Sequence, residues 1–296
     1  MRVQQNKVLI LSINTWYNVI ELDTANTKQT KTPFNRELIF AKRCDMSKWF
    51  ECINKDTYKE NKKANLFIFP FAGGGVSVFR KWGDQFNNIG VYVAQYPGRE
   101  SRFGERAIDN IDELVYELFY SLRENLDIQT PYYLFGHSMG TKIVYELTLR
   151  IKESDLPNPK GIIISAGRAP CYKEPNPIYH LDDEGFIEGL RRYDGTPDEI
   201  LDNKDLISIF LPTLRADFII DEDYQDKKYE KVDSNILGLM GDIDEEMKLD
   251  ELLKWSEYTT KSFSYKYIPG KHMFVNTSEN NVIEAIKEFV GLDESL

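Results

Sequence analysis

Ser138 lies in a sequence pattern that is typical of a nucleophilic serine. It is the centre of Gly136-His137-Ser138-Met139-Gly140, a G-x-S-x-G motif that follows the apolar run 132–135 and precedes a helical pattern through Leu147. In such a strand-to-helix turn the glycines avoid clashes, and the strained backbone holds the hydroxyl clear of the sheet. The helix N-terminus favours developing negative charge. The motif also occurs by chance in glycine-bearing loops, so its flanking strand and helix are what support the prediction.

A serine hydroxyl needs an adjacent base to react at neutral pH. The chain has three histidines. His272 lies in a loop directly after the strand pattern 264–268, where folds with this turn place their base. His137 adjoins the serine, but a sharp turn points its side chain elsewhere, so we expect it to pack structurally. His180 falls in a helical segment. We therefore predict that His272 is the base, the alternative being a surface histidine in a turn.

The acid that orients this base should lie between the serine and the histidine, after the preceding strand. The candidates are Asp242, Asp244, Glu245 and Asp250. Asp244 lies three residues beyond the glycine that ends the strand pattern, far enough to curl back toward an imidazole, so we favour it. Asp242 is nearer the strand end and could bind backbone in the turn instead. The acid would hold the tautomer of His272 and stabilise its protonated form.

Two backbone N–H groups are predicted to form an oxyanion hole. One belongs to Met139, directly after the serine, and the other to Ala72 in the glycine-rich loop 72–75 that follows the apolar run 66–71. Glycines there allow backbone N–H groups to approach a ligand. The alternatives are a plain flexible turn or a phosphate-binding loop, but no G-K-[ST] follows.

Strand and helix patterns alternate from residue 66 onward. Buried strands are predicted at 66–71, 91–95, 132–135, 161–165, 236–240 and 264–268, and helices at 77–86, 111–122, 143–147, 249–259 and 282–290. This order predicts an α/β fold with a mostly parallel, doubly wound sheet. The proline-bearing stretch 169–223 shows only short helical pieces, at 182–192, 197–201 and 205–214. A helical lid over the carboxyl ends of the strands is expected at about 171–223.

Residues 1–64 are the least informative part of the chain. Residues 8–13 could form a strand, but 26–32 and 55–65 are polar or charged, and no motif is visible. We expect an N-terminal extension at 1–64 and a hydrolase domain at 65–296. An alternative is that Met46 is the true start of the protein.

Composition excludes several classes of function. The chain carries 37 Lys and Arg against 48 Asp and Glu, a net charge of −11. Nucleic acid and anionic membranes attract basic surfaces, so neither is expected as a partner. Cys44, Cys52 and Cys171 have no metal-site spacing, so we expect reduced thiols, no metal and a cytoplasmic location. No apolar run approaches the roughly 18 residues of a membrane span.

Several segments together resemble the type II thioesterases of nonribosomal peptide and polyketide synthesis, which are α/β-hydrolases. The matching segments are FPFAGGG (69–75), YPGRE (96–100), FGHSMG (135–140), YDGTPDEIL (193–201), LPTLRAD (211–217), GDIDE (241–245) and PGKHMF (269–274). They occur in family order, and Ser138, Asp244 and His272 match the triad positions. Two departures are the long segment 1–64 and Met273, where the family often has an aromatic residue.

The resemblance implies hydrolysis of acyl groups misloaded on the phosphopantetheine arm of acyl or peptidyl carrier proteins, by a monomer without its own cofactor. The alternatives are a carboxylester hydrolase or lipase with the same triad, and an inactive carrier-protein binder. An acidic carrier meeting a chain of charge −11 predicts a local basic rim. The candidates for this rim are Arg80, Lys81, Arg99, Arg102, Arg191 and Arg192. For Arg99 we favour a structural ion pair over a substrate clamp.

Overall fold

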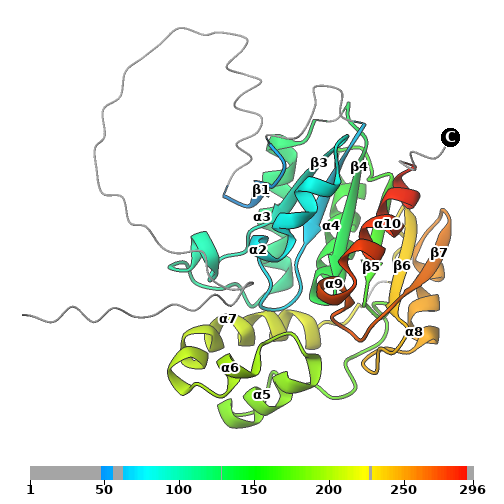
Figure 1. The fold of residues 1–296 in the computed structure, drawn as a ribbon. Helices are drawn as coiled ribbons and strands as arrows, with labels where there is room; N and C mark the ends of the chain where they lie inside the picture. The colour runs from blue at the N-terminus through cyan, green and yellow to red at the C-terminus, as the bar shows by residue number, and fades with distance from the viewer. Residues whose placement is uncertain (1–47, 56–62, 128, 227–228, 292–296) are drawn as a thin grey trace, which may run out of the picture.

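A seven-stranded sheet forms the centre of the molecule (Figure 1). The computed structural model describes residues 48–55, 63–127, 129–226 and 229–291. The strands run in the order β1-β3-β2-β4-β5-β6-β7. Their bounds are β1 Phe50–Cys52, β2 Ala64–Phe69, β3 Ile89–Ala94, β4 Tyr132–His137, β5 Gly161–Ser165, β6 Asn235–Gly241 and β7 Phe263–Ile268. β2 to β7 pair in parallel, and β1 pairs antiparallel with β3.

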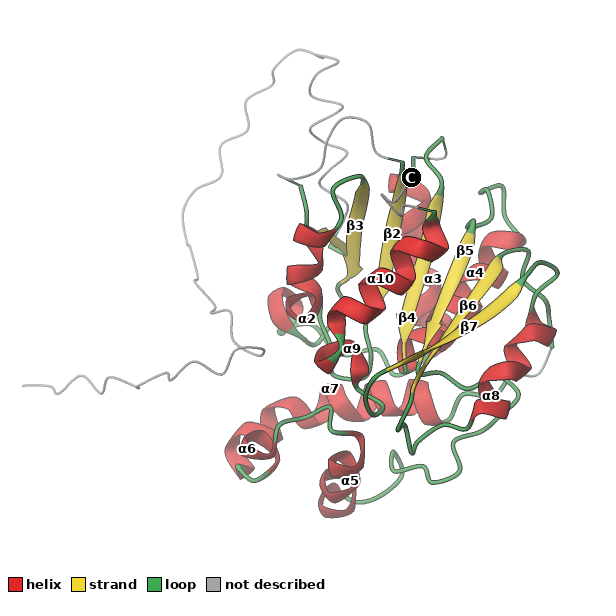
Figure 2. Ribbon diagram, turned by 45° about the vertical axis from the view of Figure 1, so that its right-hand side comes forward, coloured by secondary structure: helices red, strands yellow, loops and turns green. Residues whose placement is uncertain are grey.

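Helices cover both faces of the sheet, as Figure 2 shows. One face packs against α3 (Ile111–Asn125), α4 (Met139–Lys152) and α8 (Leu249–Leu253). The other packs against α2 (Val76–Phe79), α9 (Phe274–Thr277) and α10 (Glu279–Val290). Strands buried on both faces are predominantly apolar, and β2, β3 and β5 are buried at every position. The α/β fold with a doubly wound sheet predicted from the sequence is confirmed.

The strand order reverses at β2, because β3 lies on one side of it and β4 on the other. The loops that leave the carboxyl ends of β2 and β4 therefore turn toward opposite faces and open a crevice between them. Ligands of open α/β sheets bind at such a switch point. The two loops at this crevice are the glycine-rich loop 72–75 and the turn that contains Ser138.

A separate helical layer lies across the carboxyl end of the sheet, at the bottom of Figure 1. It consists of α5 (Asp183–Leu190), the 3₁₀ turn η3 (Arg191–Tyr193), α6 (Asp198–Leu201) and α7 (Lys204–Glu222), with its own apolar cluster. These elements fall within the stretch 171–223 predicted as a lid. α7 extends beyond the predicted end at residue 214 and contains Pro212 in its interior.

The sequence did not anticipate β1. This three-residue strand lies inside the segment expected as an extension, and Phe50 pairs with Ala94 at the edge of the sheet. Three residues are too few for a visible alternation of apolar and polar positions. Asn54 then ties the segment to the core, since its side chain donates to Ile89 O at 2.7 Å and accepts from Val91 N at 3.0 Å. The possible strand at 8–13 and the alternative start at Met46 lie outside the described residues.

The predicted helix 77–86 is also different in the structure. The α-helix α2 ends at Phe79, and Arg80–Gln85 continue as the 3₁₀ helix η1. Gly83 sits in η1 so close to Ile53 O that an added Cβ would lie 2.5 Å from it. This close approach of the β1 segment explains the tighter winding.

In the described part of the chain, no helix combines the length and apolarity needed to cross a bilayer.

The N-terminus of α4 packs directly on the backbone of β2. A Cβ on Gly140 would lie 2.0 Å from Phe69 O, and a Cβ on Gly136 would lie 2.3 Å from Gly140 O. Both obstacles are backbone atoms in the middle of the fold, which cannot move aside cheaply. These two glycines therefore allow the helix to start directly at the sheet. They also fix the position of Ser138, which lies midway between them.

Gly140→Ala is expected to destabilise the protein by about 3 kcal/mol, because the new methyl group overpacks a rigid contact. Urea denaturation of the variant and the parent protein measures the difference. Gly104→Ala is the matched control, since a Cβ there meets nothing within 4 Å. Equal unfolding free energies for the Gly140 variant and the parent protein would contradict this account of the turn.

Candidate active site

Ser138 adopts a backbone conformation that side-chain-bearing residues rarely use. Its φ is 52° and its ψ is −117°, at the junction of β4 and α4. Such strain persists only where the surroundings enforce it. Here Ser138 N donates to Ser165 O at 2.9 Å, and Ser138 O accepts from the hydroxyl of Thr141 at 2.7 Å. The hydroxyl of Ser138 is thereby held at the carboxyl end of the sheet and the start of a helix.

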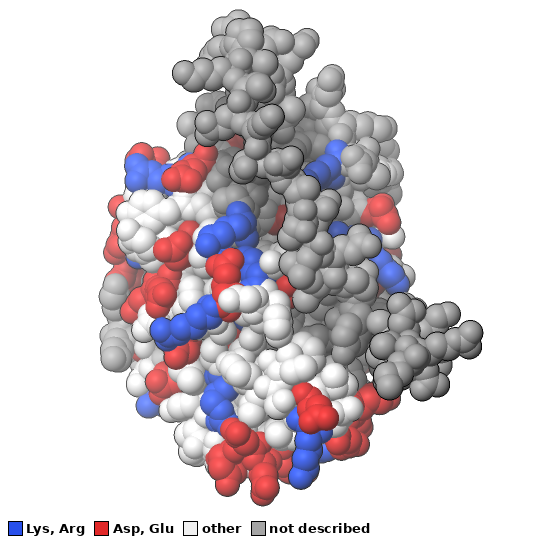
Figure 3. Space-filling model, turned by 90° about the vertical axis from the view of Figure 1, so that its left-hand side faces the viewer, with Lys and Arg blue, Asp and Glu red and all other residues white. Residues whose placement is uncertain are grey.

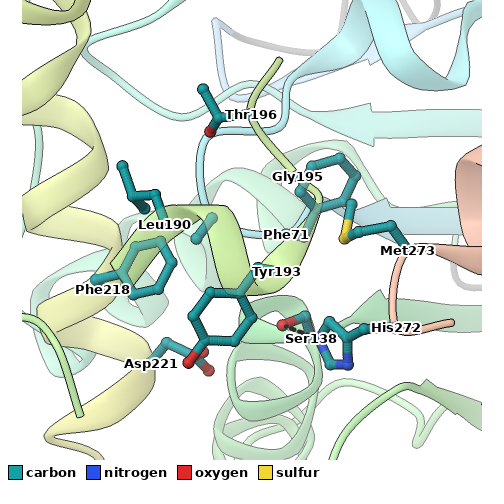
Figure 4. A pocket seen from close by; sticks show the side chains of 11 residues that line it. Phe71, Ser138, Leu190, Tyr193, Gly195, Thr196, Phe218, Asp221, His272 and Met273 are labelled. Atoms are coloured by element: carbon teal, nitrogen blue, oxygen red, sulfur yellow. Dashed lines mark hydrogen bonds between the residues drawn. The ribbon is translucent and has the colours of Figure 1, made fainter. Parts of the chain in front are cut away.

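His272 bridges Ser138 and Asp244. Its Nε2 lies 3.1 Å from Ser138 Oγ, and its Nδ1 lies 3.1 Å from Asp244 Oδ2. Figure 4 shows the contact between the serine and the histidine. The Asp244 side chain is fully buried, and that of His272 is 10% exposed. The three side chains come from the loops after β4, β6 and β7 and have the connectivity of a nucleophile, a base and an orienting acid.

The loop after β6 carries two aspartates that make different contacts. Asp244 Oδ1 accepts from Glu246 N at 2.9 Å, which leaves Oδ2 for His272. Asp242 instead accepts from Gly270 N at 2.8 Å and so braces the loop that carries His272. The other two candidates, Glu245 and Asp250, are exposed. Of the four sequence candidates, the structure brings Asp244 to the imidazole.

The two predicted oxyanion donors belong to the residue after the serine and to a residue that lines its cavity. Met139 is the first residue of α4, where a backbone N–H has no acceptor within its own helix. Ala72 lines the same cavity as Ser138. The next N–H, that of Gly73, donates to Asp217 Oδ2 at 2.7 Å, so the glycine-rich loop is held by a carboxylate of the lid helix α7.

Arg99 and Asp217 form a buried ion pair behind this loop. Arg99 Nη1 and Nη2 donate to the two carboxylate oxygens of Asp217, both at 2.7 Å, and Nη1 also donates to Gly74 O at 3.1 Å. The side chains are 8% and 2% exposed, so loss of either partner would leave an uncompensated buried charge. Glu100 holds the other end of the loop by accepting from Val76 N at 3.0 Å. The pair thus fixes the glycine-rich loop to both the sheet and the lid.

The basic rim predicted from the sequence is wrong for most of its candidates. Arg99 and Arg102 are buried. Arg102 pairs with Glu105, Arg191 with Asp198 and Asp202, and Arg192 with Glu174 and Glu246. Arg80 pairs with Glu51, and Lys81 is exposed. The sequence could not separate paired from free arginines. On the face drawn in Figure 3, basic and acidic side chains are mixed rather than segregated.

His137 is part of the packing beneath the site. It is fully buried, and burial lowers its pKa well below the usual value. Its Nδ1 lies 2.8 Å from Ser165 Oγ, and its ring contacts those of Phe71 and Phe274 edge-on. This neutral imidazole supports the loop that carries His272 but points away from the serine hydroxyl. His180 is exposed in the segment that leads to α5 and lies outside the site.

A cavity opens beside the serine and is roofed by the lid (Figure 4). It encloses about 380 Å³, counted out to its open mouth. Its apolar lining residues are Phe71, Ala72, Leu190, Phe218 and Met273, and the others are Ser138, Tyr193, Gly195, Thr196, Asp221 and His272. Within the described residues, no group of three or more His, Cys, Asp or Glu side chains could hold a metal ion. The cavity suits a small acyl group bound at the serine.

Sequence reasoning missed two contributors to the site. Tyr193 on the lid places its ring 6.0 Å from that of His272, centroid to centroid. Asp217 reaches the glycine-rich loop from α7. Both lie in segments quoted for their family resemblance, but nothing in their spacing indicates which distant residue they contact.

Comparison with known proteins identifies the family of this chain. A family model described as "Thioesterase domain" matches residues 64–290. The gramicidin S biosynthesis protein GrsT of Aneurinibacillus migulanus is 35% identical over 241 residues, which cover 81% of this chain and 92% of GrsT. The solved type II thioesterase BorB from the borrelidin biosynthetic cluster is 28% identical with a TM-score of 0.74, covering 82% of this chain and 98% of BorB.

A second solved structure gives the same result. YbtT, a type II thioesterase from the yersiniabactin NRPS/PKS pathway, is 27% identical with a TM-score of 0.75, covering 81% of this chain and 97% of YbtT. The chain therefore belongs to the thioesterase family, and it is an α/β-hydrolase of the type II thioesterase class that hydrolyses thioesters.

Proposed function

We propose that this protein releases misloaded acyl groups from the phosphopantetheine arm of carrier proteins in nonribosomal peptide or polyketide synthesis, with Ser138, His272 and Asp244 as its catalytic triad. The observation that supports this most directly is the chain of two 3.1 Å contacts that joins the three side chains. The class of substrate follows from the relatives, which are named for gramicidin S, borrelidin and yersiniabactin synthesis. The arm belongs to the substrate, and the enzyme needs no cofactor of its own.

The reaction proceeds in two halves. His272 Nε2 takes the proton of Ser138 Oγ as the oxygen attacks the thioester carbonyl, and the same imidazole returns that proton to the departing thiol. This leaves an acyl-serine ester. Water then gives its proton to His272, attacks the ester carbonyl and releases the free acid, while Ser138 recovers its proton. Asp244 keeps the Nδ1 proton of His272 in place and stabilises the imidazolium formed in each half.

The oxyanion of each tetrahedral intermediate would be held by the N–H groups of Met139 and Ala72. Losing one such donor typically costs about 10²–10³ in rate. The Ala72 N–H would be positioned by the neighbouring Gly73–Asp217 hydrogen bond. Two hydrogen bonds from Arg99 hold the Asp217 carboxylate in turn. We propose that Arg99 and Asp217 are positioning residues for this loop.

We further propose a monomer that acts in the cytoplasm with carrier proteins as partners. The proposed layout is a hydrolase domain at 65–296 with its lid at about 171–223, preceded by an extension at 1–64. Residues 48–55 of that extension add β1 to the domain.

Ser138→Ala is expected to lower kcat by about 10³-fold or more, because no other group can form the acyl-enzyme. Asp244→Asn should lower kcat by a similar factor, because the asparagine would favour the wrong tautomer of the His272 imidazole. Mass spectrometry of an acylated carrier protein after incubation with each variant measures the loss of the acyl group. Simple esters of equal chain length, tested in parallel, show whether thioesters are preferred.

Asp242→Asn is the matched control for Asp244→Asn. Asp242 accepts only from Gly270 N, and an asparagine can keep that hydrogen bond. It should retain activity within about tenfold, since it leaves the imidazole tautomer unchanged. Equal losses in the two variants would contradict the assignment of Asp244 as the orienting acid.

Asp217→Asn should lower both the melting temperature and kcat, with KM nearly unchanged. It leaves the buried Arg99 guanidinium without its counter-charge, which typically costs about 3–5 kcal/mol. Replacing both partners, with Arg99→Met and Asp217→Leu together, removes the unpaired charge and should recover much of the melting temperature. Its kcat should remain low, because the leucine side chain offers Gly73 N–H no acceptor. Recovery of kcat together with stability would mean that the pair acts on folding alone.

A further inference from the structure

Asp221 is the carboxylate in the wall of a cavity that also presents five apolar residues. It lines that cavity together with Ser138 and His272. It is the second-last residue of α7, followed by Glu222 at the helix end and by Asp223 as the C-cap. A helix C-terminus carries partial negative charge and favours cations, so three successive acidic residues there are electrostatically unfavourable. Local stability of α7 does not explain why Asp221 is acidic.

Lys142 offsets this charge from one side only. It forms an ion pair with Asp221 Oδ1, and the two side chains are 13% and 12% exposed. Lys142 is not among the residues that line the cavity, whereas Asp221 is. The carboxylate is therefore the member of the pair that borders the cavity, and the ion pair uses one of its two oxygens, Oδ1. A charged group in such a partly desolvated site interacts more strongly than it would in water.

The position of Asp221 places this charge near the reacting carbonyl. Lys142 lies in the first turn of α4, four residues after Ser138, which is the N-cap of that helix. Its partner Asp221 therefore lies beside the serine end of the cavity, and Figure 4 shows it across Ser138 from His272. An amino group on the α or β carbon of an acyl chain is only two or three bonds from the carbonyl that Ser138 would attack.

The neighbouring Glu222 does not share this role. Its Oε2 accepts from Ile178 N at 2.7 Å and Tyr179 N at 2.8 Å, and its Oε1 accepts from the Tyr193 hydroxyl at 3.1 Å. Those contacts hold the lid segments together, and Glu222 is not among the lining residues of the cavity. Two adjacent carboxylates thus have different tasks, one inside the lid and one facing the acyl group.

We propose that Asp221 is a specificity-determining residue that favours acyl groups with an ammonium group close to the thioester over neutral acyl groups of the same size. This inference rests on the proposed function, and it concerns which acyl groups are released rather than how they are released. A charge-assisted hydrogen bond between the ammonium group and Asp221 would supply the preference. Neutral acyl groups would contact the apolar part of the same cavity.

The test compares L-2-aminobutyryl-pantetheine with butyryl-pantetheine, which share a carbon chain and differ in the amino group. The ratio of their kcat/KM values is measured for the parent protein and for Asp221→Asn, after subtraction of spontaneous hydrolysis. We expect the ratio to fall by about tenfold or more in the variant, as loss of one charged hydrogen bond implies. The ratio cancels any effect common to both thioesters, and the melting temperature of the variant shows whether it is folded.

Two further variants separate charge from structure. Asp221→Asn combined with Lys142→Met removes the ion pair as a unit and should lose the preference as the single variant does. Glu222→Gln removes the adjacent carboxylate and should leave the ratio unchanged. An unchanged ratio in both Asp221 variants, or an equal fall for both thioesters, overturns the proposal. Absence of any thioester hydrolysis by the parent protein would instead contradict the proposed function.

Discussion

The hydrogen bond between Ser138 and His272 joins residues 134 positions apart, and the rest of the site depends on it. A parallel sheet makes this possible because the carboxyl ends of its strands, and the loops that leave them, lie at one edge. The contact also needs the serine at a strained φ of 52°. Gly136 and Gly140 permit that strain by letting α4 start against the backbone of β2. The reactivity of one hydroxyl therefore follows from close packing in the centre of the fold.

The lid is connected to this centre through polar contacts rather than through apolar packing alone. Asp217 joins α7 to the glycine-rich loop and to Arg99. Lys271 beside the imidazole pairs with Asp194 of the lid at 3.1 Å. Four residues beyond Asp217 on the same helix, Asp221 borders the acyl cavity. One helix thus contacts the loop that carries a proposed oxyanion donor and the wall that would contact the acyl group, so a displacement of α7 would affect both.

Much of the fold could be predicted because buried parallel strands are continuous apolar runs, as at Gly161–Ser165, whose predicted bounds match the structure. The site residues could be proposed because chain order and loop position restrict the choice of base and acid. The ion-pair partners were less predictable. All five arginines proposed as a basic rim are paired or buried, since a charge's partner depends on tertiary contacts that no local pattern encodes. The strand β1 has three residues, too few to show an alternation of apolar and polar positions.

The most direct test of this account is covalent labelling with a fluorophosphonate, which reacts with a serine only when a neighbouring base activates it. Intact-mass measurement followed by peptide mapping would locate the label. The account predicts a single label on the peptide that contains Ser138, and its loss in His272→Ala. A folded protein that takes no label, or takes it on another residue, would contradict the claim that the Ser138–His272 contact makes this hydroxyl a nucleophile.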